Sequence, residues 1–463
     1  MFMNPFEALK LRYSIIGAGR SGISIAKYLK SKGASVFLSE SEQLSNLLYF
    51  SQEEFKNLNI DFEIGGHTDK VFESDILIVC PGIPLNSDII VKAKSLGKKV
   101  YGEIEVASWF CTVPIVAITG TNGKTTTTAL TGEIFKSAGF NSIVCGNIGK
   151  PFASVLNQIK EDSIIILEVS SFQLTTIEKF KPEVAIILNI TEDHIDWHGS
   201  FENYIEAKFA INKNQTKENF FIYNYNNDIL YKQVQLRKID CNLGAFGVFP
   251  SIENFSNLQH ICFISEDSIN YYSNDKKTTE KIIDIKDIYI PGKHNVYNSM
   301  AAVLSSKCYN ISNDIISNTL KSFKGVEHRI EFVREVNGIK YYNDSKSTNF
   351  DSLFVALESF PDNIILIMGG KKGDNKFQMI DNLIEKKVKG IITIGQSKDI
   401  IFDHYKNVVP VVKCDNLQDA VIKSSEVAKE GDIVLFSPGY KSFDMFDNYE
   451  HRGNEFKKSV NKL

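Results

Sequence analysis

Short runs of apolar residues recur along the chain, and most of them end in a glycine-rich or polar turn that leads into a helical pattern. They include Tyr13–Ile16, Ile76–Val79, Val113–Ile118, Ser163–Leu167 and Ile364–Met368. Continuous apolar runs of this length are typical of strands buried on both faces of a parallel sheet. Because such runs alternate with helical patterns, the sequence predicts parallel sheets joined by crossover helices.

The length of 463 residues corresponds to about three domains of ordinary size. We place them at residues 1–110, 111–323 and 324–463. The predicted fold class is α/β with three domains: a Rossmann-like N-terminal domain, a central P-loop mononucleotide-binding α/β domain and a C-terminal Rossmann-like domain. The polar, strand-like residues 215–285 are expected to complete the central sheet.

The most informative turn is Gly120-Thr121-Asn122-Gly123-Lys124-Thr125-Thr126, which lies between an apolar run and a helical pattern. Backbone N–H groups at a helix N-terminus can bind a phosphate there, and the glycines let the main chain approach it. Lys124 adds a positive charge, and the Thr125 hydroxyl can hold Mg²⁺. The spacing is shorter than G-x-x-x-x-G-K-[ST], because Ile118 stands where that motif has its first glycine. We predict a mononucleotide site, with an ordinary glycine turn as the alternative.

Acidic residues follow other apolar runs of the central region. Glu168 comes directly after Ser163–Leu167, and His194 lies in the acidic loop Asn189–Asp196. Since parallel strands end at one edge of a sheet, we expect Glu168 to bind Mg²⁺ near the phosphate loop, and His194 to bind a metal or a phosphate. Helix capping is the alternative for Glu168, and a structural role is the alternative for His194. Lys208 follows on a helical pattern, and its spacing alone favours a solvent-exposed lysine.

Two amides begin a later helical pattern. Asn295 and Asn298 follow Pro291-Gly292 and are three residues apart, so they share a helix face. This pair suits the recognition of a purine or a phosphate, and N-capping is the alternative.

A second glycine loop, Gly17-Ala18-Gly19-Arg20-Ser21-Gly22, precedes the acidic residue Glu40 by about 20 positions. This pattern is typical of NAD or FAD binding. The loop itself requires only an anion at a helix N-terminus, so another nucleotide diphosphate fits equally well. Glu40 can accept a hydrogen bond from a ribose or from a uracil N–H. Cys80–Pro84 follows a strand and is either a ligand loop or a plain turn.

The last domain repeats the pattern. The polar heptad Asn343–Asn349 follows the expected strand Lys340–Tyr342. Asp344 can accept from a ribose, and Lys346 and Thr348 can bind an acidic substrate.

Composition narrows the functional class. The net charge of −4 gives no basic field for nucleic acid. The seven cysteines contain no C-x-x-C pair, which favours reduced thiols over disulfides or zinc. No apolar run approaches the roughly 20 residues of a membrane helix, and the N-terminus shows no secretory signal. We expect a cytoplasmic protein without membrane insertion.

Together these stretches resemble the Mur ligase family of ATP-dependent amino-acid ligases that build the peptidoglycan peptide, over essentially the full chain. The resemblance rests on the phosphate loop, Gly146-Asn147-Ile148-Gly149, Glu168–Leu174, Asn189–Asp196 and Gly292–Ala302. His328–Glu331, Tyr342–Asn349, Ser437-Pro438, Ser442–Phe446 and Tyr449–Gly453 are similar to the members that add D-glutamate. Members that add L-alanine or a diamino acid usually have a Tyr-Ala-His-type segment where this chain has Asp-Ser-Lys.

The resemblance implies that the chain joins D-glutamate to UDP-N-acetylmuramoyl-L-alanine through an acyl phosphate, with ATP, two Mg²⁺ sites and a carbamylated lysine. The implied catalytic residues are Lys124, Glu168, His194 and Lys208, and the implied Mg²⁺ ligands are Thr125, Glu168, His194 and carbamylated Lys208. ATP would contact Gly120, Thr121, Asn122, Gly123, Lys124, Thr125, Thr126, Asn295, Arg329 and Asp344. The UDP substrate would contact Gly17, Gly19, Arg20, Ser21, Gly22, Glu40, Ser41, Gly82 and Asn147, and D-glutamate would contact His328, Lys346, Thr348, Ser442 and Phe443.

The chain departs from the family pattern in places, since Glu40 stands where Asp is common and Phe443 where Leu is common. Gly439-Tyr440-Lys441 is an unusual variant. The resemblance also implies a monomer that closes by a hinge near Phe323–Val326.

Three alternative functions remain. Another ligase of the superfamily would keep the ATP site but differ at Asp344–Asn349 and Ser442–Phe443. An NAD-dependent oxidoreductase would leave the phosphate loop, Glu168 and His194 without a role. A binding or regulatory NTPase would not need the polar strand ends of the third domain.

Overall fold

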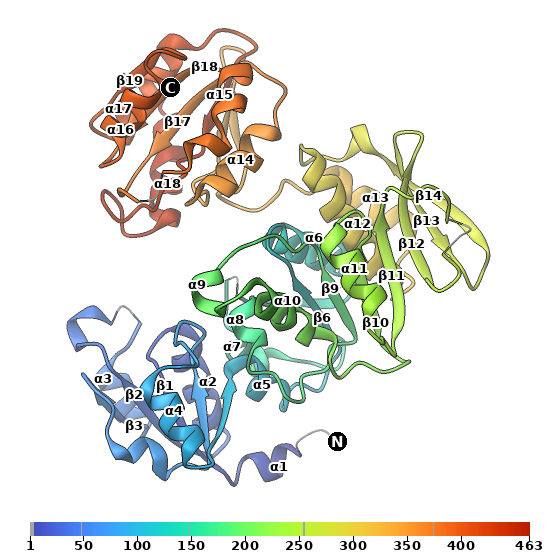
Figure 1. Cartoon of the computed structure of the whole chain (residues 1–463), viewed down its shortest axis with the longest axis vertical. Helices are drawn as coiled ribbons and strands as arrows, with labels where there is room; N and C mark the ends of the chain where they lie inside the picture. The colour runs from blue at the N-terminus through green and yellow to red at the C-terminus, as the bar shows by residue number, and fades with distance from the viewer. Residues whose placement is uncertain (1–3, 48, 148, 253–254, 374) are drawn as a thin grey trace. The chain divides into compact units, whose positions relative to one another are not determined.

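The computed structural model describes residues 4–463 apart from 48, 148, 253–254 and 374, and within this part it contains three β-sheets with helices against them (Figure 1). The chain forms two compact units. The first holds the residues up to Asp287 together with Tyr297–Lys321, and the second holds Ile288–Val296 with Ser322–Leu463. Two sheets belong to the first unit and one to the second. The predicted α/β class is confirmed, while the predicted domain boundaries at 110/111 and 323/324 stay a prediction.

The first sheet has the strand order β3-β2-β1-β4-β5, and every neighbouring pair is parallel. Because the order reverses at β1, the loops after β1 and β4 lie side by side at a switch point, where such sheets bind ligands. Its strands are β1 (Arg12–Ile16), β2 (Ser35–Glu40), β3 (Asp61–Ile64), β4 (Ile76–Val79) and β5 (Lys99–Gly102), with helices α1 (Pro5–Ala8), α2 (Arg20–Ser31), α3 (Gln52–Asn57), α4 (Asp88–Ser95) and α5 (Glu103–Ser108).

The second sheet has nine strands in the order β14-β13-β12-β11-β10-β9-β6-β8-β7. Its strands are β6 (Ile115–Thr119), β7 (Asn141–Gly146), β8 (Ser163–Glu168), β9 (Val184–Ile187), β10 (Phe220–Asn224), β11 (Asn242–Gly247), β12 (His260–Ser265), β13 (Ser268–Ser273) and β14 (Thr278–Asp284). Only the pairs β12–β13 and β13–β14 are antiparallel among those described. The expectation that residues 215–285 complete this sheet is confirmed, although the segment also contains a helix that the pattern did not predict.

That helix is α11 (Asp228–Leu236), which crosses from β10 to its parallel neighbour β11. A parallel pair needs such a crossover, so the helix follows from the topology. The other helices of this region are α6 (Lys124–Ser137), α7 (Phe152–Val155), α8 (Ser171–Leu174), α9 (Ile195–His198), α10 (Phe201–Phe209), α12 (Lys293–Lys307) and α13 (Asn313–Ser322).

The third sheet, in the second unit, has the order β15-β16-β20-β17-β18-β19, and only its edge pair β15–β16 is antiparallel among the described strands. Its strands are β15 (Glu331–Val336), β16 (Ile339–Asn343), β17 (Ile364–Gly369), β18 (Val388–Ile394), β19 (Val411–Lys413) and β20 (Ile433–Phe436). Helices α14 (Phe350–Glu358), α15 (Asp381–Lys387), α16 (Lys398–Tyr405), α17 (Leu417–Val427) and α18 (Tyr449–Val460) accompany them. Alternate residues of β17 enter two separate cores, Leu366 on one face and Ile367 on the other.

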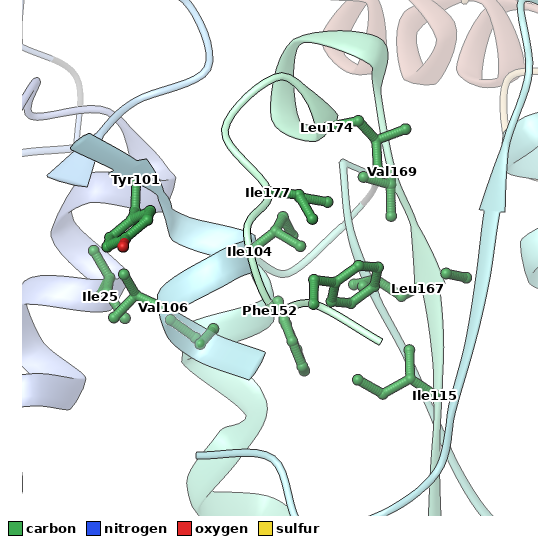
Figure 2. Close-up of a cluster of buried hydrophobic side chains, with 14 of the residues drawn as sticks. Ile25, Tyr101, Ile104, Val106, Ile115, Phe152, Leu167, Val169, Leu174 and Ile177 are labelled. Atoms are coloured by element: carbon green, nitrogen blue, oxygen red, sulfur yellow. The ribbon is translucent and has the colours of Figure 1, made fainter. Parts of the chain in front are cut away.

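One apolar cluster runs through both sheets of the first unit. It joins Tyr101, Ile104 and Val106 of the N-terminal part to Phe152 and Leu167 of the central part (Figure 2). All seven cysteines are free, as the sequence predicts. In the described part of the chain, no helix combines the length and the apolar character needed to cross a membrane.

Arg452 of α18 is a buried cation within the second unit. The residue is only 1% exposed, and its guanidinium donates to main-chain and hydroxyl oxygens. It donates to Ser345 O at 2.7 Å, to Ser345 Oγ at 3.1 Å and to Tyr440 O at 2.9 Å. We expect Arg452→Met to lower the free energy of unfolding of this unit by about 3 kcal/mol, because it leaves buried acceptors unpaired. Urea denaturation measures this loss. Lys458→Met on the exposed face of the same helix should change it by less than about 0.5 kcal/mol, and equal effects would contradict the assigned role of Arg452.

Candidate functional site

The phosphate loop connects β6 to α6 at the edge where β8 and β9 also end. β6 lies between these two strands, and both pair with it in parallel. Asn189, just after β9, holds the loop: its backbone O accepts from Thr121 N at 3.0 Å and its Oδ1 accepts from Asn122 N at 2.8 Å. Its Nδ2 donates to Asn122 O at 3.0 Å. Asn189 therefore holds the main chain of the loop in one conformation, a role that the sequence did not reveal.

The loop conformation depends on Gly123, whose φ of +85° is rare for residues with side chains. A Cβ there would lie 2.4 Å from Oδ1 of Asn298. The ammonium group of Lys124 donates to Gly120 O and Thr121 O, both at 2.8 Å. A cation, a turn of main-chain groups and a helix N-terminus thus meet within one loop, which is the arrangement that binds a phosphate.

Glu168 at the end of β8 is the buried acid next to this loop. It is 2% exposed, and the strand register sets it opposite Ile118 of β6. Its Oε1 accepts from Nδ2 of Asn147 at 2.8 Å, whereas its Oε2 is buried and has no hydrogen-bond partner among the described residues. A buried carboxylate oxygen without a partner fits a bound cation. Ser170 caps the following helix α8, so the capping alternative for Glu168 is not supported.

His194 stands at the start of α9 with a left-handed φ of +53°. Its side chain is half exposed, with Nε2 3.4 Å from Oδ2 of Asp193 and its ring 4.8 Å from that of Phe172. Its geometry leaves it open to a ligand. No three His, Cys, Asp or Glu side chains gather as a metal cluster in the described ranges.

Lys208 corrects the sequence interpretation. Its spacing favoured a solvent-exposed lysine, but the side chain is 1% exposed, and its Nζ lies 4.6 Å from the ring centroid of Tyr204. These two residues are four apart and share the inner face of α10. Burial, assisted by the positive charge of Lys124, lowers the pKa of Lys208 well below its usual range. The Tyr204 hydroxyl is 2.9 Å from Oγ1 of Thr121, which ties α10 to the phosphate loop.

His198 was not singled out in the sequence, yet it belongs to this cluster. Its Nε2 lies 3.0 Å from Oγ of Ser171, and its ring stacks on Phe172 at 5.5 Å between centroids with an interplanar angle of 7°. Burial lowers its pKa to about 4, with smaller effects from Lys208 and His194. A neutral imidazole therefore packs against the ring of Tyr204 at neutral pH, with 5.2 Å between the ring centroids.

A cavity of about 360 Å³ lies at the switch point of the first sheet. It is lined by Gly17, Gly19, Arg20, Ser21, Glu40, Ser41, His67, Cys80, Pro81, Gly82 and Ile83. The structure thus brings together all the residues predicted to bind UDP except Gly22 and Asn147. Gly22 supports the loop from behind, since a Cβ there would lie 2.2 Å from Gly17 O. Asn147 bonds to Glu168 instead, and its neighbour Ile148 lies outside the described residues. Their ligand stays a prediction.

Two polar side chains shape this cavity. Glu40 accepts from the N–H groups of Ala18 at 2.7 Å and Glu42 at 2.9 Å. Burial opposes ionisation of Glu40, but these hydrogen bonds outweigh it and hold its pKa below the usual value. His67, which the sequence interpretation missed, lies with Nδ1 2.6 Å from Oγ of Ser39.

The second unit holds the remaining predicted residues. His328 has a φ of +65°, and its Nδ1 accepts from Nδ2 of Asn343 at 2.9 Å. Asp344 accepts from Ile330 N at 3.2 Å and from the Ser437 hydroxyl at 2.7 Å. Burial raises its pKa to about 6, with Arg329 opposing the shift.

The predicted D-glutamate residues differ in exposure. Lys346 places its Nζ 5.7 Å from the ring centroid of Tyr449. Ser442 is buried, Thr348 is half-buried and Phe443 is 61% exposed. Asn295 donates from Nδ2 to Pro291 O at 2.6 Å, a contact at the start of α12. The ligand roles of these residues stay predictions.

Sheet, phosphate loop and buried acid together define an α/β protein with a phosphate-binding loop, and three family models, all of Mur ligase domains, cover most of the chain. These are the MurD N-terminal domain at residues 12–89, the Mur ligase middle domain at 118–306 and the Mur ligase, glutamate ligase domain at 328–439. The chain belongs to the Mur ligase family.

Full-length relatives narrow the comparison. The UDP-N-acetylmuramoylalanine–D-glutamate ligase of Caldicellulosiruptor saccharolyticus is 43% identical over 453 residues, which cover 97% of this chain and 98% of that protein. The ligase of the same name from a Thermoanaerobacter species is 42% identical over 454 residues, with the same coverage of both chains. The solved UDP-N-acetylmuramate-alanine ligase of Thermotoga maritima shares the fold, with a TM-score of 0.58 at 17% identity over 98% of this chain and 99% of that one.

The burial of His198 predicts a pH-dependent loss of stability. Because its folded-state pKa is about 4, below the unfolded value near 6.5, the unfolded state binds the proton first as pH falls. Its contribution is complete above pH 6.5 and is lost between pH 6.5 and 4, by up to about 3 kcal/mol. Denaturant unfolding of the parent and of His198→Asn across this range should show a flatter profile for the variant. Parallel profiles would contradict the buried neutral imidazole.

Proposed function

We propose that this chain is the ATP-dependent ligase that joins D-glutamate to UDP-N-acetylmuramoyl-L-alanine in peptidoglycan precursor synthesis. The observation that carries the proposal is that the phosphate loop and the buried carboxylate of Glu168 lie at the same edge of the sheet. One oxygen of this carboxylate has no hydrogen-bond partner among the described residues. Relatives that match nearly the whole chain bear the name of this activity, which supports the same reaction.

The reaction requires activation of a carboxylate, because a carboxylate is a poor acyl donor. An oxygen of the muramoyl-alanine carboxylate attacks the γ-phosphorus of ATP, and the bond to ADP breaks. The D-glutamate amine then attacks the carbonyl carbon of the acyl phosphate; inorganic phosphate leaves and the nitrogen loses a proton. Lys124 and the loop N–H groups at Gly120–Thr126 lie where they would neutralise charge on the transferred phosphoryl group.

Magnesium supplies charge neutralisation at the phosphate oxygens when it is bound. Glu168 would hold it through the buried oxygen that has no hydrogen-bond partner among the residues the structure describes, with the Thr125 hydroxyl at the start of α6 and His194 as further ligands. Asn147 fixes the other oxygen of Glu168 and so orients this carboxylate.

Lys208 would carry a carbamate. Its buried amine, with a strongly lowered pKa, is the neutral nucleophile that such a reaction needs. The nitrogen attacks the carbon of CO₂, an N–C bond forms, and one proton is released to solvent. The resulting anion would help to hold the second Mg²⁺ and would attract the positive charge of Lys124.

Both substrates have candidate sites of their own. The cavity lined by Gly17, Arg20, Glu40 and their neighbours would hold the UDP group, with the diphosphate at the N-terminus of α2. In the second unit, D-glutamate would bind at His328, Lys346, Thr348, Ser442 and Phe443, and ATP would add contacts to Asn295, Arg329 and Asp344. The protein would act as a monomer in the cytoplasm.

Phosphate release from ATP tests the function. With UDP-N-acetylmuramoyl-L-alanine present, release should require D-glutamate, and L-glutamate or L-alanine should not replace it. Lys124→Ala should reduce the rate by at least about a hundredfold, because charge on the phosphoryl group loses its partner. Release that is indifferent to D-glutamate would contradict the proposal.

The carbamate has its own test. Lys208→Ala should lose activity that bicarbonate cannot restore, while a short-chain carboxylic acid should restore part of it by supplying the missing anion. Lys232→Ala, at an exposed position on α11, is the matched control and should retain full activity. Full activity of Lys208→Ala without any added acid would disprove the role.

A further inference from the structure

A single buried carboxylate receives four N–H groups at the joint between the two sheets of the first unit. Glu105 of α5 is fully buried. Its Oε2 accepts from Glu178 N at 3.1 Å and from Phe180 N at 2.9 Å. Its Oε1 accepts from Lys179 N at 2.9 Å and from the Trp109 indole at 2.8 Å. Each carboxylate oxygen therefore accepts two hydrogen bonds, and three of the four donors are the backbone N–H groups of consecutive residues.

The joint connects elements of different sheets. α5 directly follows β5, the last strand of the first sheet, whereas Glu178–Phe180 lead into β9 of the second. Tyr101 donates to Oε2 of Glu178 at 2.7 Å, and Arg20 donates to Gly149 O at 3.2 Å across the same joint. The surrounding contacts are apolar (Figure 2). Apolar packing is non-directional, so the hydrogen bonds are what fix one orientation of the two sheets.

This orientation matters for a ligand that spans both parts. Cys80, Pro81 and Ile83 line the 360 Å³ cavity, and they also line a small hollow with Phe172 and Trp197 of the central part. The ring of Phe172 lies 4.8 Å from that of His194. The two hollows therefore share lining residues at the joint, and the second extends to side chains of the central part.

We propose that Glu105 is a positioning residue that holds the two sheets in register, so that a substrate anchored by its nucleotide in the first reaches the phosphate loop of the second. The inference rests on the proposed function for the identity of that substrate. Glu105 touches no reacting atom; it acts through the amides of Glu178–Phe180.

Glu103 offers a matched control on the same helix. It is also buried, but its Oε1 accepts only from Ala153 N, at 2.6 Å, and its Oε2 has no partner among the described residues. Burial raises its pKa to about 7. Glutamine at 103 keeps the one acceptor that is used, whereas glutamine at 105 turns an NH₂ group toward N–H donors.

Amide hydrogen exchange tests the clamp without any substrate. In Glu105→Gln, the amides of residues 178–180 should exchange on the order of tenfold faster or more, from the loss of bonds to a charged acceptor. Glu103→Gln should leave them unchanged. If Glu105→Gln fails to fold, amide exchange is measured in the parent protein instead. Its amides at residues 178–180 should exchange as slowly as those of β9, and fast exchange would overturn the proposal.

Binding separates positioning from a general loss of stability. Glu105→Gln should bind UDP, which would occupy the cavity of the first sheet, within twofold of the parent, but should show a KM for UDP-N-acetylmuramoyl-L-alanine raised by about tenfold. Equal weakening of both ligands, or no change in either, would overturn the proposal. If the parent itself shows no preference for the full substrate over UDP, the proposed function fails, and amide exchange still decides the role of Glu105.

Discussion

The pairing of β6 with β8 on one side and β9 on the other is the constraint on which the nucleotide end of the chain depends. The register sets Ile118 opposite Glu168 and Thr119 opposite Ile187, so the phosphate loop, the buried acid and Asn189 all emerge at one edge. A slip of one residue would turn Glu168 to the other face of the sheet. All residues of β6, β8 and β9 are buried, which makes such a slip costly.

Around that edge the fold keeps polar groups where burial opposes their charge. Lys208 packs on Tyr204 and His198 packs on Phe172, while Glu168 has one buried oxygen that finds no hydrogen-bond partner in the described part of the chain. Each arrangement destabilises the fold relative to apolar residues of the same size. A site that must bind a cation and a polyanionic nucleotide explains why they persist, since local conflicts of this kind are typical of functional residues.

The two sheets of the first unit are joined differently from the elements of the second. A shared apolar cluster and the carboxylate of Glu105 link the N-terminal and central parts into one body. The third sheet instead has a core on each face, built from its own helices. The cavity at the first switch point and the phosphate loop thus belong to one folded unit, while the residues predicted to bind D-glutamate belong to the other.

The sequence by itself determined the α/β class, the glycine loops and the strands that are buried on both faces, because such strands are continuous apolar runs and phosphate loops need glycine at fixed positions. The predicted strand Ile76–Val79 is β4 without any change. Tertiary structure alone decided that Lys208 is buried, that Asn189 templates the loop, and that Glu105 clamps two sheets. These facts depend on strand order and helix docking, which bring together residues that are distant in the chain. Local periodicity in the sequence does not show which distant residues come into contact.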